Sequence, residues 1–134
     1  MFKHTTHIRV RYGETDKMGY VYYGNYALYY EQGRTEAIKS LGMSYKALEE
    51  QGYILPVSEM HIKYKRPAIY DDLLRIESTL TELPGRKMIF HTEVFNEAGD
   101  LLNQGETVLV FVNAHTRRAC TAPPLLLQLL KAYF

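Results

Sequence analysis

The pattern that most constrains the fold is one long helical stretch followed by four strand-like segments in a row. From about residue 24 to residue 41, apolar residues recur at the spacing of a single helix face. Pro84-Gly85 and the stretch 96–100 are typical of turns, so consecutive strands can pair as hairpins. We therefore predict an α+β fold in which a five-stranded antiparallel sheet wraps around one long central helix. The predicted strands are residues 7–12, 57–65, 73–82, 86–96 and 101–113.

Length and composition indicate a single domain that folds without a disulfide, a metal or a cofactor. The 134 residues are enough for one core, and we expect one domain over residues 1–134. Ser44 can cap a short second helix that ends near Gly52, and an apolar stretch from Leu125 to Leu130 predicts another short helix. The five histidines lack zinc-ligand spacing and Cys120 is the only cysteine, so we expect no metal, no redox cofactor and no disulfide.

Charge and hydropathy exclude several classes of partner. The formal net charge is +1, which gives no electrostatic case for nucleic acid or an anionic membrane. The 12 tyrosines could stack on single-stranded nucleic acid, but that role needs a basic groove, and many of them lie on the apolar helix face. No apolar run is long enough to span a bilayer, and the first residues lack the apolar core of a signal peptide. We expect a cytoplasmic protein.

The segment from residue 11 to residue 26 carries the most specific signal for chemistry. It places Asp16 on a glycine-containing loop between a predicted strand and the start of the aromatic-rich helix. The first N–H groups of a helix have no partner within the helix and carry partial positive charge. A carboxylate just ahead of them could act on a carbonyl whose oxygen they receive, as acyl transfer requires. The alternative role is that Asp16 caps a turn, as most loop aspartates do.

Residues in this segment and beyond it match the pattern of a known family. They are Tyr12, Asp16, Gly19, Val21, Tyr22, Asn25, Tyr26, Glu31, Arg34, Pro56-Val57, Tyr64, Pro67 and Tyr70-Asp71-Asp72-Leu73. Over roughly residues 5 to 124 the chain resembles the 4-hydroxybenzoyl-CoA thioesterase-like acyl-CoA thioesterases. The resemblance implies the hotdog fold, hydrolysis of an acyl-CoA to a free acid and CoA, and a homodimer or homotetramer with active sites shared between subunits.

The resemblance also implies roles for individual residues near the helix start. Asp16 is the catalytic carboxylate, as nucleophile or general base, and the N–H groups near Tyr23 and Gly24 form the oxyanion site. Tyr23 stands where the family often has histidine, which argues against a dehydratase. Glu31 is the alternative catalytic carboxylate, because a second hotdog branch places its acid within this helix. Without such a role, we expect Glu31 to pair with Arg34, which falls near the centre of the apolar helix face.

Substrate binding requires an acyl pocket and a cationic surface. Tyr22 and Tyr26 are candidates for the pocket. Two basic clusters could hold the CoA phosphates: Arg86 with Lys87, which match phosphate-contacting positions of the family, and Arg117 with Arg118. The same clusters would suit an acyl carrier protein. A non-catalytic acyl-binding hotdog module is the remaining alternative, although loss of the Asp16 carboxylate would be its expected sign. A tyrosine-lined pocket would suit aromatic or short aliphatic acyl groups, and both alternatives stay open.

Overall fold

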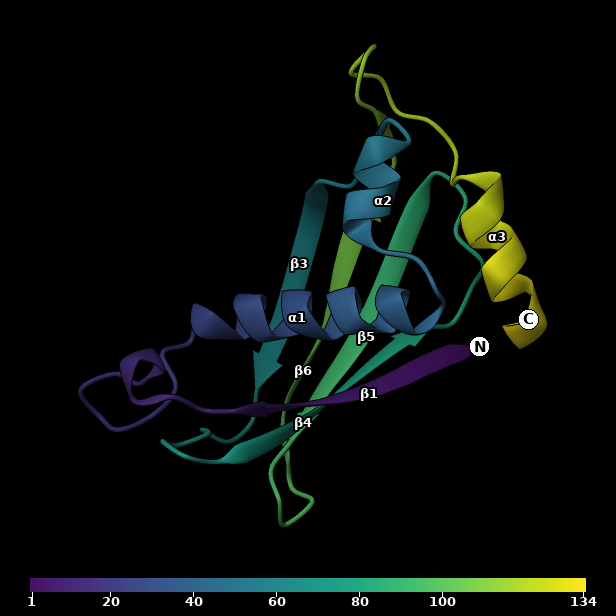
Figure 1. Ribbon diagram of the computed structural model, residues 1–134. Helices are drawn as coiled ribbons and strands as arrows, with labels where there is room; N and C mark the ends of the chain where they lie inside the picture. The colour runs from purple at the N-terminus through teal and green to yellow at the C-terminus, as the bar shows by residue number, and fades with distance from the viewer.

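The computed structural model describes residues 1–134 as an antiparallel five-stranded sheet with a helix lying across one face (Figure 1). The strand order is β1-β4-β5-β6-β3, so β1 and β3 form the two edges. A two-stranded sheet, β2 with β7, extends one end. The elements are β1 (Phe2–Arg9), α1 (Asn25–Ser40), α2 (Tyr45–Glu50), β2 (Tyr53–Ile54), β3 (Val57–Tyr64), β4 (Leu73–Leu80), β5 (Lys87–Phe95), β6 (Leu101–Val110), β7 (Val112–Asn113) and α3 (Pro124–Leu130), with 3-10 turns at Tyr12–Glu14 and Lys131–Tyr133.

The α+β architecture with five antiparallel strands is confirmed, and the first strand is placed differently. We predicted a strand at residues 7–12, but β1 spans Phe2–Arg9 and pairs with β4 from Phe2↔Leu80 to Arg9↔Leu73. Residues 3–7 lie on a sheet edge and are polar, so the sequence there lacks the apolar alternation that would indicate a strand. The predicted strand 101–113 is also divided, since β7 leaves the main sheet to pair with β2.

Helix α1 is held close to the sheet at a glycine. An added Cβ at Gly33 would lie 2.8 Å from side-chain atoms of both Ile76 and Ser78 on β4. Glycine therefore lets the middle of α1 approach the sheet more closely than any other residue would. The helical part is not one central helix alone. The 16-residue α1 crosses the sheet face, while the shorter α2 and α3 cover one end (Figure 1).

The core consists of two apolar clusters. The cluster that we call the C-terminal cluster joins α2, α3 and the second half of α1 to one end of the sheet, and includes Ile38, Leu48, Phe90 and Leu126. The cluster that we call the site cluster joins the first half of α1 to the other end, with Tyr26, Tyr29 and Tyr30 at its centre. Five polar residues are also buried in the molecule: Arg34, Ser78, Thr92, Asn103 and Thr107.

Candidate active site

Asp16 lies on a tight loop that its own carboxylate closes. Oδ1 of Asp16 accepts hydrogen bonds from the N–H groups of Met18 at 2.9 Å and Tyr20 at 3.2 Å. Gly19 has φ +84°, a left-handed conformation that glycine adopts without strain. The capping role weighed for Asp16 is therefore present, and it occupies only Oδ1. No protein group donates to Oδ2, so one carboxylate oxygen remains for chemistry.

The start of α1 lacks a capping side chain. Gly24 is the N-cap residue, it offers no side-chain acceptor, and the first turn contains no acidic residue. Among the backbone N–H groups at this end, that of Asn25 donates to Tyr22 O and that of Tyr26 to Tyr23 O. The N–H groups of Tyr23 and Gly24 have no acceptor within the protein. A helix end in this state offers hydrogen-bond donors and partial positive charge to an anionic oxygen.

A cavity of about 350 Å³ opens beside Asp16. Tyrosine rings form much of its wall: Tyr26 and Tyr64 have ring centroids 5.6 Å apart, and Tyr23 meets Tyr64 edge-on at 6.4 Å. The Tyr26 hydroxyl accepts a hydrogen bond from the Ala68 N–H, and burial raises the pKa of Tyr26. Tyr26 therefore stays protonated near neutral pH. The full lining is Asp16, Met18, Tyr20, Val21, Tyr23, Tyr26, Tyr64, Lys65, Arg66 and Pro67.

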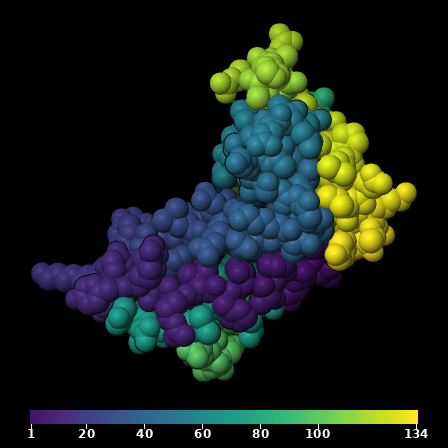
Figure 2. Space-filling view, in the orientation of Figure 1, coloured from purple at the N-terminus to yellow at the C-terminus, as the bar shows by residue number.

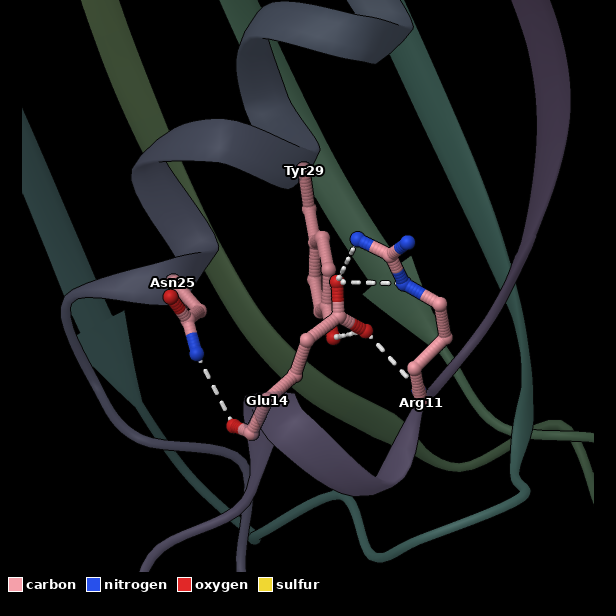
Figure 3. A network of polar contacts seen from close by, with 4 residues as sticks. All are labelled: Arg11, Glu14, Asn25 and Tyr29. Atoms are coloured by element: carbon pink, nitrogen blue, oxygen red, sulfur yellow. Dashed lines mark hydrogen bonds and ion pairs between the residues drawn. The ribbon is translucent and has the colours of Figure 1, made fainter.

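Two residues ahead of Asp16, the side chain of Glu14 forms a hydrogen-bond network with α1 (Figure 3). Its Oε1 accepts from the Arg11 N–H at 2.8 Å and from the Tyr29 hydroxyl at 2.9 Å, and its Oε2 faces the Arg11 guanidinium at 3.3 Å. Burial acts to raise the pKa of Glu14, but the hydrogen bonds from Arg11 and Tyr29 outweigh it and hold the pKa below its ordinary value. Glu14 is thus a carboxylate at neutral pH.

Glu31 lies apart from the Asp16 cavity. It lines a second cavity of about 330 Å³ together with Arg34, Tyr45 and Glu49. No ion pair within 4 Å joins Glu31 to Arg34, so the expected close pairing is absent, although the Glu31 charge acts to raise the pKa of Arg34. Arg34 is 4% exposed, and its one hydrogen bond is a long contact of 3.5 Å to Thr107 Oγ1. Burial lowers the pKa of Arg34 and raises that of Tyr45 to about 12.

Of the predicted substrate-binding tyrosines, the structure brings only Tyr26 to the cavity wall. Tyr22 is 49% exposed and its ring packs against that of Tyr23, with centroids 4.8 Å apart. An added Cβ at Gly24 would lie 2.9 Å from the Tyr22 ring, so this ring covers the Cα of Gly24. Tyr22 therefore belongs to the surroundings of the helix start rather than to the cavity.

The two predicted basic clusters lie at the other end of the sheet in the same chain. Lys87 begins β5 opposite Val110, whereas Tyr64 of the cavity ends β3 opposite Asn103. Arg86 precedes Lys87, and its carbonyl accepts from the Phe111 N–H. The segment that carries Arg117 and Arg118 projects beyond α2 (Figure 2, yellow-green, top), away from the loop that precedes α1. The cationic groups at the Asp16 cavity are instead Lys65 and Arg66, and Arg66 pairs with Asp100 at 3.4 Å.

Residues 10–130 match the family model of the thioesterase-like superfamily. The chain belongs to this superfamily. It is 39% identical over 94 residues to a putative acyl-CoA thioesterase, YneP, of Bacillus subtilis, covering 70% of this chain and 68% of that one. It is 34% identical over 106 residues to the acyl-CoA thioester hydrolase YbgC of Escherichia coli, covering 79% of each.

Solved structures of the superfamily share the fold. A DHNA-CoA thioesterase from Staphylococcus aureus superposes with a TM-score of 0.86 at 34% identity, covering 100% of this chain and 85% of that one. The family resemblance and the hotdog fold that it implies are thereby confirmed. No helix here is both long and apolar enough to cross a membrane, and no group of three His, Cys, Asp or Glu side chains is arranged to hold a metal ion.

Three features of this superfamily member were not assigned from its sequence. Tyr64 matches the family pattern, but only the fold shows that it stands opposite Tyr26 in the cavity wall. Lys65 and Arg66 lie in an ordinary strand-end sequence, and nothing in their spacing points to Asp16. Glu14 gave one usable signal, which is its position three residues after Arg11, a spacing that favours contact across a tight turn. The hydrogen bond between the Tyr29 hydroxyl and Glu14 joins residues fifteen positions apart, so no local sequence pattern indicates it.

Proposed function

We propose that this protein hydrolyses acyl-CoA thioesters to a free carboxylic acid and CoA, with Asp16 as nucleophile or general base. The proposal is supported by two residues that line one aromatic cavity: Asp16, whose Oδ2 accepts no hydrogen bond, and Tyr23, whose N–H has no acceptor within the protein. Thioester hydrolysis is the reaction class of the superfamily, and the names of YneP and YbgC favour acyl-CoA as the substrate.

Two routes of attack fit this site. In the first, Oδ2 of Asp16 attacks the thioester carbonyl, CoA leaves as the thiolate, and water hydrolyses the resulting mixed anhydride. In the second, Asp16 takes a proton from water as that water attacks, and the proton passes to the leaving thiolate. Both routes place negative charge on the carbonyl oxygen, where the N–H groups of Tyr23 and Gly24 would stabilise it. Loss of one such donor typically costs about 2.7–4 kcal/mol of transition-state stabilisation.

Asp16→Asn tests this assignment with little disturbance to the loop. The amide oxygen can still accept from Met18 and Tyr20, so we expect an unchanged melting temperature. The charge and the base are lost, and kcat should fall on the order of 10²–10⁴-fold in a thiol-release assay. Glu31→Gln is the matched control and should keep near-normal turnover. Normal turnover in Asp16→Asn, with loss of activity in a folded Glu31→Gln, would assign the chemistry to Glu31.

We further propose that the active enzyme is at least a homodimer joined through β3. This eight-residue edge strand pairs only with β6, and most of its residues are exposed, including Val57 and Tyr64. An exposed regular edge favours pairing with another strand. Antiparallel pairing of two β3 strands about a twofold axis would place the Tyr64 end of one copy beside the Val57 end of the other. The second copy could then bring Arg86 and Lys87 toward the Asp16 cavity.

Subunit complementation tests the shared site. We expect Asp16→Asn and the Arg86→Glu/Lys87→Glu double variant each to be poorly active on acyl-CoA. If each site takes Asp16 from one chain and the cations from the other, random mixing of refolded subunits should restore about a quarter of wild-type activity. No restoration in confirmed heterodimers would contradict sharing. The same assay with acyl carrier protein thioesters tests the alternative carrier, and binding without turnover would favour the non-catalytic module.

A further inference from the structure

Glu14 connects the segment that leads to Asp16 with two turns of α1. Beyond its side-chain bonds, its carbonyl oxygen accepts from the Tyr22 N–H at 2.9 Å and from Asn25 Nδ2 at 2.9 Å. Asn25 and Tyr29 are four residues apart, so both face Glu14 from the same side of the helix (Figure 3). Both side-chain hydrogen bonds that join residues 10–16 to α1 end on Glu14.

We propose that Glu14 is a positioning residue, which together with Asn25 and Tyr29 fixes the Asp16 carboxylate relative to the N–H groups of Tyr23 and Gly24. The inference rests on the proposed thioesterase function and extends it to residues that touch no substrate. The bonds within the Asp16 loop run to Met18 and Tyr20, so they shape the loop without tying it to α1. The Glu14 contacts link the residue just before the segment 15–24 to helix α1, which begins just after it.

The surroundings of Glu14 make these contacts rigid. Tyr29 is 2% exposed and the Glu14 side chain is 18% exposed, so little water competes for their hydrogen bond. Hydrogen bonds to an ionised carboxylate are shorter and about twice as strong as neutral ones. Misplacing a reacting group by about 1 Å can cost on the order of 10²-fold in rate. A tie of this kind therefore affects turnover even when the fold survives without it.

Tyr29→Phe removes one hydroxyl from this tie, and the neighbouring residue offers a matched control. The Tyr30 hydroxyl donates to Asn103 Oδ1 at 2.7 Å and is buried in the same cluster, away from Glu14. Each substitution deletes one buried phenol hydrogen bond from α1, so we expect similar losses in melting temperature. We expect kcat to fall about tenfold in Tyr29→Phe with KM within about twofold, and to stay within about twofold in Tyr30→Phe. Equal kcat values in the two variants would overturn the proposal.

Glu14→Gln and a double-mutant cycle then test whether the effect passes through Asp16. Glutamine keeps an acceptor for Arg11 and Tyr29 but loses the charge, so we expect a fall of about 10–100-fold in kcat. In the Asp16→Asn background the same change should alter the residual rate less than about threefold, because residues that act as a unit are not additive. Equal factors in both backgrounds would show that Glu14 acts independently and would overturn the proposal.

The outcomes separate this inference from the proposed function. If Asp16→Asn turns over normally, the proposed role of Asp16 fails, and with it the role of Glu14. If Asp16→Asn is inactive while Glu14→Gln and Tyr29→Phe keep wild-type kcat, the proposed function stands and only the positioning role is refuted. Where the residual rate of Asp16→Asn is too small to compare, the Tyr29→Phe and Tyr30→Phe pair decides.

Discussion

Gly105→Ala should separate β3 from β6, because glycine is required there by a backbone contact. An added Cβ at residue 105 would lie 2.3 Å from the carbonyl oxygen of His61 and 2.9 Å from the Tyr30 ring. The ring could shift, but the carbonyl belongs to the paired strand and cannot move without breaking the ladder around Ile62↔Gly105. Overpacking of this kind costs about 1–3 kcal/mol and can exceed it at a backbone clash.

The assay is thermal and urea unfolding, with Gly85→Ala as the control. No atom lies within 4 Å of a Cβ added at Gly85, and its φ is not left-handed, so alanine there should be neutral or stabilising by about 0.4–1 kcal/mol. Gly105→Ala should lower the melting temperature by about 3–5 °C for each kcal/mol lost. It should also weaken the proposed dimer, since β3 forms its edge. A Gly105→Ala protein as stable as Gly85→Ala would refute the reasoning.

Three further predictions concern charged residues. The pKa of Glu14 is lower in the folded state, so its contribution to stability is present above its ordinary value of 4.5 and is lost as the pH falls through the folded value. Urea unfolding at pH 7 and pH 3 should show a larger acid-induced loss for wild type than for Glu14→Gln. Arg34→Met should be neutral or stabilising in urea unfolding, since the buried guanidinium has no carboxylate within 4 Å and makes one long hydrogen bond. A loss above about 3 kcal/mol would show that Glu31, whose charge acts to raise the pKa of Arg34, stabilises Arg34 strongly. If Arg86 and Lys87 hold the CoA phosphates, Arg86→Glu/Lys87→Glu should raise KM for acyl-CoA far more than it lowers kcat, and should leave an acyl-pantetheine substrate unaffected.

The sequence predicted those elements whose pattern reflects their own burial. Strand β5 was located by the turn residues on either side of it, Pro84-Gly85 and 96–100, and its alternate residues Met88, Phe90 and Val94 are buried. Strand β1 was misplaced because its position depends on pairing with β4, and residues 3–7 carry no apolar alternation. Local pattern therefore located β3, β4 and β5 to within two residues at each end, but not β1.

The sequence was sufficient to propose Asp16 and the start of α1 as a candidate site, but not to predict the contacts around them. Asp16 and the start of α1 were identified because the motif is contiguous in sequence. The cavity wall required Tyr64 and Lys65 to come from the end of β3, and the network required Tyr29 to reach Glu14. Such contacts depend on how α1 lies on the sheet, which Gly33 and Gly105 permit and no local pattern encodes.

Because the core is divided into two clusters, many residues that stabilise the fold are separate from the residues that line the Asp16 cavity. The C-terminal cluster contains α2 and α3 and none of the residues that line the Asp16 cavity, whereas the site cluster supplies Val21 and Tyr26 to its wall. Among the helices, only α1 belongs to both clusters, and strands β1, β4, β5 and β6 also contribute to both. Substitutions around Leu48 or Leu126 would therefore alter thermal tolerance while the Asp16 cavity keeps its shape. Within one small domain, resistance to heat and the shape of the Asp16 cavity can evolve along separate sets of positions.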